Sequence, residues 1–170
     1  MPYTDLLRTT VFLTAAEATA LGAITAIGIG RDDNPTALIV AAAWWLIALI
    51  LGLRLGAPDR AAEGVRDALV KARTATSLPQ ESPARISLAR LWPIAATAVV
   101  AGALGIFFPG VAAVGAGYAL LVSLAWRTKE AAVLGIEHRD GVKFYVVPNS
   151  AFRPIMLVRT PGLRSSRPSS

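Results

Sequence analysis

Cysteine is absent from the 170-residue chain, and histidine occurs once, at position 138. The lack of cysteine excludes disulfide bonds, thiolate catalysis and cysteine-based metal sites. His138 has no cluster of further metal-binding residues beside it, so we expect a solvated turn residue rather than a ligand. The chain also lacks a Gly-rich phosphate loop ending in Lys-Ser/Thr, the H-E-x-x-H pattern and the G-x-S-x-G pattern. The sequence therefore predicts no catalytic residue, no metal site and no cofactor.

Charged residues are also scarce. They make up 16% of the chain, whereas a soluble domain carries roughly 25%. The charges gather between long uncharged stretches, of which Leu91–Trp126 is the longest. This segregation is typical of a chain that crosses a lipid bilayer.

Four apolar stretches approach the length of about 20 residues that a helix needs to cross roughly 30 Å of hydrocarbon. Turn-forming residues, Asn34-Pro35 and Pro109-Gly110, separate the members of each pair. Because the last two stretches are short, a re-entrant pair that does not reach the far side is the alternative to two full spans. The predicted spans are Thr10–Gly30, Thr36–Gly56, Leu91–Phe108 and Val111–Trp126.

The basic residues are distributed very unevenly between the two sides that these spans create. Sixteen of the 17 Lys and Arg residues fall on the side of both termini, and Arg31 alone falls on the other. Cytoplasmic flanks of membrane helices are enriched in Lys and Arg. The sequence therefore predicts a multi-pass protein of the cytoplasmic (inner) membrane with cytoplasmic N- and C-termini. The many Arg and Ala residues and the few Lys residues are typical of a GC-rich bacterial genome.

The segments outside the spans have patterns of their own. Between Pro58 and Arg73, apolar residues recur at helical spacing and predict a short helix, either on the membrane surface or as a solvated connector. Thr74–Pro83 has the composition of a linker. We divide the chain into a first transmembrane hairpin (1–56), a cytoplasmic loop (57–90), a second transmembrane hairpin (91–127), a cytoplasmic β-hairpin segment (128–160) and a disordered basic tail (161–170).

The pattern after the fourth span changes from helical to strand-like. Val133–His138 and Val142–Val147 flank Arg139-Asp140-Gly141, and Asp-Gly between such runs favours a hairpin. Ile155–Arg159 is predicted as a third strand. The expected fold class is an all-α membrane bundle of four transmembrane helices in two hairpins, with a small cytoplasmic β-hairpin at the C-terminus.

This C-terminal segment is too short to build a core of its own. Its apolar side chains must therefore be buried against the inner helix ends, the lipid headgroups or another protein. The docking candidates are Phe144, Tyr145, Ile155 and Leu157. The basic residues predicted to face the lipid surface are Arg127, Lys129, Arg164 and Arg167.

Glu17 is the only carboxyl group inside a predicted span. A carboxylate near the bilayer centre costs roughly 2.5–3.5 kcal/mol and usually faces the bundle interior. Thr10 and Thr14 share its helix face, and helical rise places Thr97 and Ser123 near its depth. Glu17 is either a proton or cation site or a protonated carboxyl bonded to a neighbouring hydroxyl.

A second layer of the predicted bundle holds aromatic rings. Helical rise places Trp44, Trp45 and Tyr118 at one depth, closer to the outer surface than Glu17. One tryptophan packing between helices and the other facing lipid would explain these rings, and an aromatic ligand site is the alternative.

A glutamate in the first of four spans of a small protein is similar to the small multidrug resistance transporters, with Thr14-Ala15-Ala16-Glu17 carrying the match. The resemblance covers only these residues. Those transporters have short loops throughout, whereas this chain has a long loop at 57–90 and a strand-like tail, so we do not assign it to that family.

Two functions are consistent with these features. The first is a non-catalytic subunit or scaffold that docks a partner or the lipid surface through its cytoplasmic C-terminal segment. The second is a small proton- or cation-coupled transporter that uses Glu17. Small residues at a spacing of four, such as Ala98 and Gly102, suit a tight bundle or a homo-oligomer. The expected partners are the lipid bilayer and a second copy or a membrane-complex partner, but no nucleic acid, because no binding motif is present.

Overall fold

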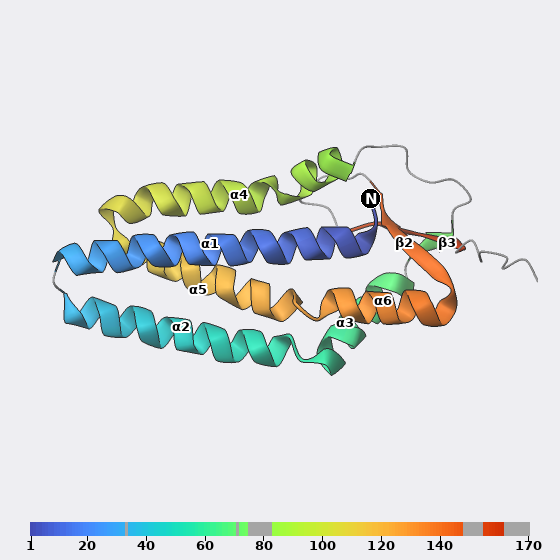
Figure 1. The fold of residues 1–170 in the computed structure, drawn as a ribbon, viewed down its shortest axis with the longest axis horizontal. Coiled ribbons are helices and arrows are strands. Elements are labelled where there is room, and N and C mark those ends of the chain that lie inside the picture. The colour runs from blue at the N-terminus through green and yellow to red at the C-terminus, as the bar shows by residue number, and fades with distance from the viewer. Residues whose placement is uncertain (33, 71, 75–82, 148–154, 162–170) are drawn as a thin grey trace, which may run out of the picture.

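The computed structural model describes residues 1–32, 34–70, 72–74, 83–147 and 155–161. Four helices in it are long and apolar enough to cross a membrane, and they lie side by side (Figure 1). They agree with the four predicted spans, although the first and third begin earlier than predicted. The helices are α1 (Tyr3–Asp32), α2 (Pro35–Leu55), α4 (Pro83–Phe107) and α5 (Pro109–Trp126).

Proline marks the start of each returning helix, as the sequence predicts. Asn34 caps α2, because its Oδ1 accepts the backbone N–H of Ala37 at 3.1 Å, and Pro35 occupies the first turn. Pro109 begins α5 in the same way. Pro93, in contrast, lies inside α4, which starts ten residues earlier. Proline in a helix interior removes a backbone hydrogen bond, and the first turns of α4 bend away from the rest in Figure 1.

Helix α5 forms the centre of the bundle. It packs against α1, α2 and α4, whereas the consecutive helices α1 and α2 touch only slightly. In lipid, helices associate through close backbone approach, which small residues permit. The buried residues of α5 are all small: Ala112, Ala113, Ala116, Gly117, Ala119, Ser123 and Ala125.

Two glycines show how closely α2 approaches α5. A Cβ atom added to Gly52 would lie 2.9 Å from the Cβ of Leu124, and one added to Gly56 would overlap the carbonyl oxygen of Leu124. The hydroxyl of Thr128 also donates to the carbonyl oxygen of Gly56 at 2.8 Å. The end of α2 therefore contacts both α5 and the turn at Arg127-Thr128 that follows α5.

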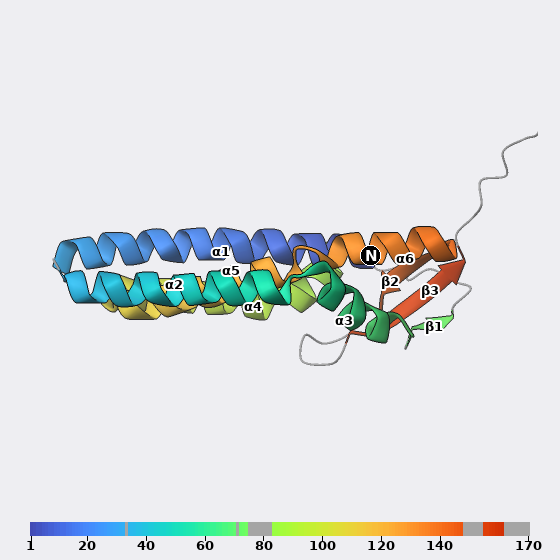
Figure 2. The same cartoon turned by 90° about the horizontal axis from the view of Figure 1, so that it is seen from below.

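The second part of the molecule lies at the end where α1 begins (Figures 1 and 2). We call it the α/β unit. It comprises α3 (Pro58–Val70), α6 (Lys129–Asp140) and a three-stranded sheet, packed on the first turns of α1 and α4. The sheet order is β1-β3-β2, with β1 (Arg73–Thr74) parallel to β3 (Leu157–Pro161) and β3 antiparallel to β2 (Val142–Val146).

Helix α3 confirms the helix predicted from Pro58, but the predicted hairpin is wrong in its first strand. Residues 133–138 belong to α6, and Gly141 is the left-handed C-cap of that helix, with a φ of 63°. Asp-Gly suits both structures, because a helix C-cap and a tight hairpin each favour a residue with positive φ. Strand β2 pairs instead with β3, which begins two residues after the predicted third strand. The predicted linker and tail fall largely on residues 75–82 and 162–170, outside the described residues.

A core of large apolar side chains holds the α/β unit together. Several segments distant in the sequence contribute to it, including the N-terminal residues, whose Met1 carbonyl accepts the N–H of Val146 at 2.9 Å. The buried members are Met1, Tyr3, Leu6, Leu7, Val65, Leu69, Ile86, Val133, Val142, Phe144, Val146 and Leu157. The C-terminal strands are thus buried against the ends of the chain's own helices, which corresponds to one of the three environments that the sequence left open.

Candidate functional site

Glu17 lies at the midpoint of α1, on the face that the helix turns to its neighbours. Thr10, Thr14 and Leu21 are buried on the same face, and Glu17 itself is half-buried. Within the described part of the chain, its carboxyl group makes no hydrogen bond and no ion pair. No described residue therefore replaces the water that this carboxyl group would lose in a bilayer.

The threonine hydroxyl groups near Glu17 donate hydrogen bonds to the backbone of their own helix. Thr10 Oγ1 donates to the carbonyl oxygen of Leu6 at 2.8 Å, and Thr14 Oγ1 donates to that of Thr10 at 2.9 Å. Such bonds to the preceding turn are the usual way for a threonine to satisfy its hydroxyl inside a helix. The bond between Glu17 and a neighbouring hydroxyl, one of the two alternatives that the sequence left open, is therefore not formed among the described residues.

The structure does not link Thr97 or Ser123 to Glu17. Thr97 is exposed on α4, and its hydroxyl donates to the carbonyl oxygen of Ile94 at 2.8 Å. Ser123 is buried on α5, but its hydroxyl points to the carbonyl oxygen of Val11, at 3.5 Å, more than one turn from Glu17. No hydrogen bonds among the described residues connect the predicted carboxyl-hydroxyl layer.

The aromatic residues come together as their depths suggested. The rings of Trp44 and Tyr118 lie 5.4 Å apart between centroids, tilted by 60°. Both indoles are anchored to α5, since Trp44 Nε1 donates to the carbonyl oxygen of Val114 at 3.3 Å and Trp45 Nε1 to that of Ala113 at 2.9 Å. A Cβ atom on Gly117 would overlap the Trp44 indole. These contacts make the tryptophans packing residues that join α2 to α5.

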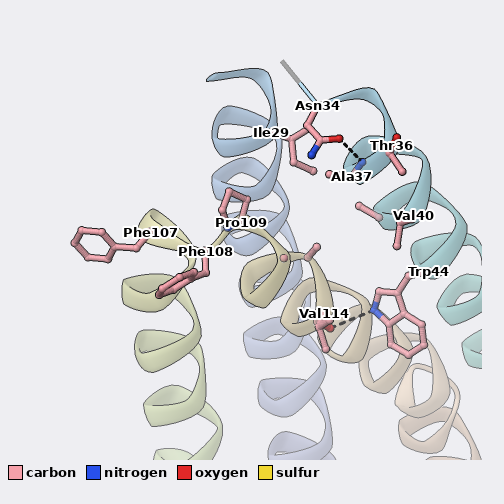
Figure 3. Close-up of a pocket in the computed structure, with 13 residues that line it drawn as sticks. Ile29, Asn34, Thr36, Ala37, Val40, Trp44, Phe107, Phe108, Pro109 and Val114 are labelled. Atoms are coloured by element: carbon pink, nitrogen blue, oxygen red, sulfur yellow. Dashed lines mark hydrogen bonds between the residues drawn. The ribbon is translucent and has the colours of Figure 1, made fainter. Parts of the chain in front are cut away.

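A cavity of about 720 Å³ opens at the far end of the bundle, away from the α/β unit (Figure 3). Its walls are mostly apolar and include Trp44, Phe108 and Val114, with Asn34 at the turn before α2. The amide oxygen of Asn34 is used by the helix cap. Sequence reasoning missed this cavity, although both of its turns, Asn34-Pro35 and Phe108-Pro109, were marked by proline. A smaller cavity of about 300 Å³ between α1, α2 and α5 is lined by Trp45 and Ser123.

The predicted docking residues divide into two groups. Phe144 and Leu157 are only 3% and 5% exposed and belong to the core of the α/β unit. Tyr145 is half-buried and Ile155 is exposed. Only these two therefore remain accessible to a partner.

The predicted lipid-surface cations also differ from one another. Arg127 is exposed, whereas the ammonium group of Lys129 lies 4.1 Å from the centroid of the Trp126 ring. A cation over an aromatic face is held by the ring quadrupole. Arg164 and Arg167 lie outside the described residues.

No group of three or more His, Cys, Asp or Glu residues that could hold a metal ion occurs in the described ranges. His138 is exposed in the last turn of α6. Comparison with known protein families, with curated proteins and with solved structures finds no match to this chain. The residues themselves are therefore the basis for a functional proposal.

Proposed function

We propose that the protein is a non-catalytic subunit or scaffold of a bacterial cytoplasmic membrane, with both termini in the cytoplasm. In this proposal the four long helices anchor the chain, and the α/β unit presents a docking surface to a protein partner. The uneven distribution of Lys and Arg supports this orientation.

The observation that carries the proposal is the set of apolar side chains that the α/β unit leaves uncovered. Ile155 and Met156 are 36% and 44% exposed directly before β3. The carbonyl oxygen of Met156 accepts the N–H of Val147 at 3.0 Å, so the backbone that carries this pair is fixed. Adjacent apolar side chains presented on a fixed backbone are a feature of protein contact surfaces.

Point variants test this proposal better than truncation, because removing the C-terminal segment would also remove the core residues Phe144 and Leu157. The double variant Ile155→Glu, Met156→Glu places charge on the surface only. After chemical cross-linking and purification in mild detergent, we expect this variant to lack proteins that copurify with the native chain. The variant Arg60→Glu, at an exposed position of α3, is the control and should keep them.

Two results would count against the scaffold. One is that the double variant retains every cross-linked protein. The other is that the native chain cross-links only to lipid, which would indicate a surface that rests on the membrane.

A second candidate, a small proton- or cation-coupled transporter, is favoured by the absence of a partner for Glu17 among the described residues. An ionisable group inside a membrane helix often marks an ion pathway. Glu17→Gln keeps the shape and removes the titratable proton. Proton or cation flux into liposomes should stop in this variant and continue in Thr97→Val, which alters an exposed hydroxyl on α4. Flux that is equal in the native chain and in Glu17→Gln would exclude this role.

A further inference from the structure

Three arginines from distant parts of the sequence meet at the rim of the α/β unit. Arg66 comes from α3, Arg139 from the last turn of α6 and Arg159 from β3. All three line one cavity of about 250 Å³. The packing of α3 on α6 and the pairing of β3 with β2 bring them together.

The floor of this cavity is fixed by the core beneath it. Leu69 and Phe144 line the cavity and are both buried core residues. Arg66 stands about one helical turn before Leu69, and Arg159 lies opposite Phe144 in the register of β2 and β3. The arginine backbones are therefore held in place by residues that cannot move without disturbing the core.

The charges around the cavity do not cancel. Among the described residues that line the cavity, Asp140 is the only one with a carboxylate, and its Oδ1 accepts a hydrogen bond from Arg139 Nε at 2.9 Å. Arg159 acts on the same carboxylate electrostatically. Arg66 has no ion pair among the described residues. A second carboxylate, that of Glu137, accepts the backbone N–H of the lining residue Phe144 at 3.0 Å. Three guanidinium groups against these two carboxylates leave the described part of the site with a net positive charge.

We propose that Arg66, Arg139 and Arg159 form a binding site for a phosphate-bearing ligand. The planar guanidinium group presents paired N–H donors that match phosphate oxygens, and it stays charged at every physiological pH. A rim of arginines over an apolar floor suits a phosphate group at the rim with a small organic remainder below it.

The position of the site favours a soluble ligand over a lipid headgroup. Helix α6 points away from the bundle (Figures 1 and 2). Ten residues of helix separate Lys129 from Arg139, which corresponds to about 15 Å. The headgroup layer on one side of a bilayer is only roughly 5–8 Å thick. The arginines therefore lie beyond the reach of headgroups if the membrane ends near Trp126.

Pyrophosphate is a suitable probe, titrated by calorimetry into the full chain in nanodiscs of phosphatidylcholine. We expect saturable binding that weakens roughly tenfold in Arg66→Gln and in Arg159→Gln, since each variant removes a charged hydrogen bond. Arg66→Lys should fall between these and the native chain, because it keeps the charge but loses the paired donors. Arg60→Gln, on the same helix but outside the cavity lining, should bind as the native chain does.

Asp140→Asn is a variant for which we expect tighter rather than weaker binding of pyrophosphate. It removes the competing carboxylate and frees Arg139, so pyrophosphate should bind several-fold more tightly. A general loss of folding cannot produce tighter binding, which keeps this result separate from damage to the α/β unit.

Repeating the titration in nanodiscs that also contain phosphatidylglycerol distinguishes the two sources of phosphate. Equal affinity in both discs supports a soluble ligand. If phosphatidylglycerol weakens the binding of pyrophosphate to the native chain but not to Arg66→Gln, the lipid headgroup occupies the site instead. The proposal is overturned if the native chain shows no saturable binding, or if Arg60→Gln weakens binding as much as Arg66→Gln.

Discussion

The bundle and the α/β unit are packed in two different ways. The helix at the centre of the bundle buries only alanine, glycine and serine. The α/β unit buries large side chains such as Leu7, Ile86 and Phe144. The bundle also buries Leu21 and Ile29 of α1, each packed against small residues of α5. One chain of 170 residues therefore contains two kinds of core, one built mainly of small residues and one built mainly of large side chains.

The difference follows from the solvent of each region. In water, burying a large apolar side chain contributes about 1.5–3 kcal/mol, so large residues form the core. In lipid, an exposed leucine is as well solvated as a buried one, and helices gain more from close backbone contact. The exposed side chains of α2 are accordingly large, as at Leu38, Ile39 and Leu46.

The strongest test of this comparison is Phe144→Ala. Phe144 is 3% exposed in the core of the α/β unit, and removing a buried phenyl ring costs about 3–5 kcal/mol. Urea titration in nanodiscs, with hydrogen exchange of β2 as the readout, should show that loss. Phe108→Ala is the matched control, because Phe108 is 63% exposed at the far end of the bundle. Equal losses of stability in the two variants would contradict the view that the two regions have different kinds of core.

A smaller effect is expected from adding one methyl group to the bundle. Gly56→Ala places a Cβ against the backbone of Leu124, and overpacking of this kind costs about 1–3 kcal/mol. Unfolding by SDS should then occur at lower detergent concentration. Gly135→Ala, in α6, meets no atom within 4 Å and should gain up to about 1 kcal/mol in helix propensity. If both substitutions stabilise the protein, the close approach of α2 and α5 is not required.

The smallest effect concerns the indole hydrogen bonds between α2 and α5. Trp45→Phe removes a bond of 2.9 Å to the carbonyl oxygen of Ala113, for which we expect a loss of about 1 kcal/mol. Trp44→Phe removes a longer bond, 3.3 Å, and should cost less. SDS titration of both variants checks the order, and a reversed order would mean that ring packing rather than the N–H groups holds α2.

Much of the bundle could be predicted from local patterns. Uncharged length and the turns at Asn34-Pro35 and Pro109-Gly110 were sufficient for four helices, because each signal is contained within a few residues. Helical rise alone also placed Trp44 and Tyr118 at one depth, and the structure adds the contact between their rings. The lack of a partner for Glu17 among the described residues could not be predicted, because it depends on where each nearby hydroxyl points.

The α/β unit was harder to predict, since its local signals fit more than one structure. The run before Asp140-Gly141 was interpreted as a strand, yet it is helical, with Val133 buried against other segments of the unit. The same positive-φ glycine ends a helix or turns a hairpin. The choice between them depends on contacts with residues far away in the sequence.

The sequence by itself determined the four apolar helices, their turns and the side on which the basic residues gather, because composition and spacing act locally. Only the tertiary structure decided that β2 pairs with β3, that Phe144 and Leu157 face the chain's own core, and that three distant arginines share one cavity. These arrangements result from the burial of apolar surface between segments that no short stretch of sequence contains.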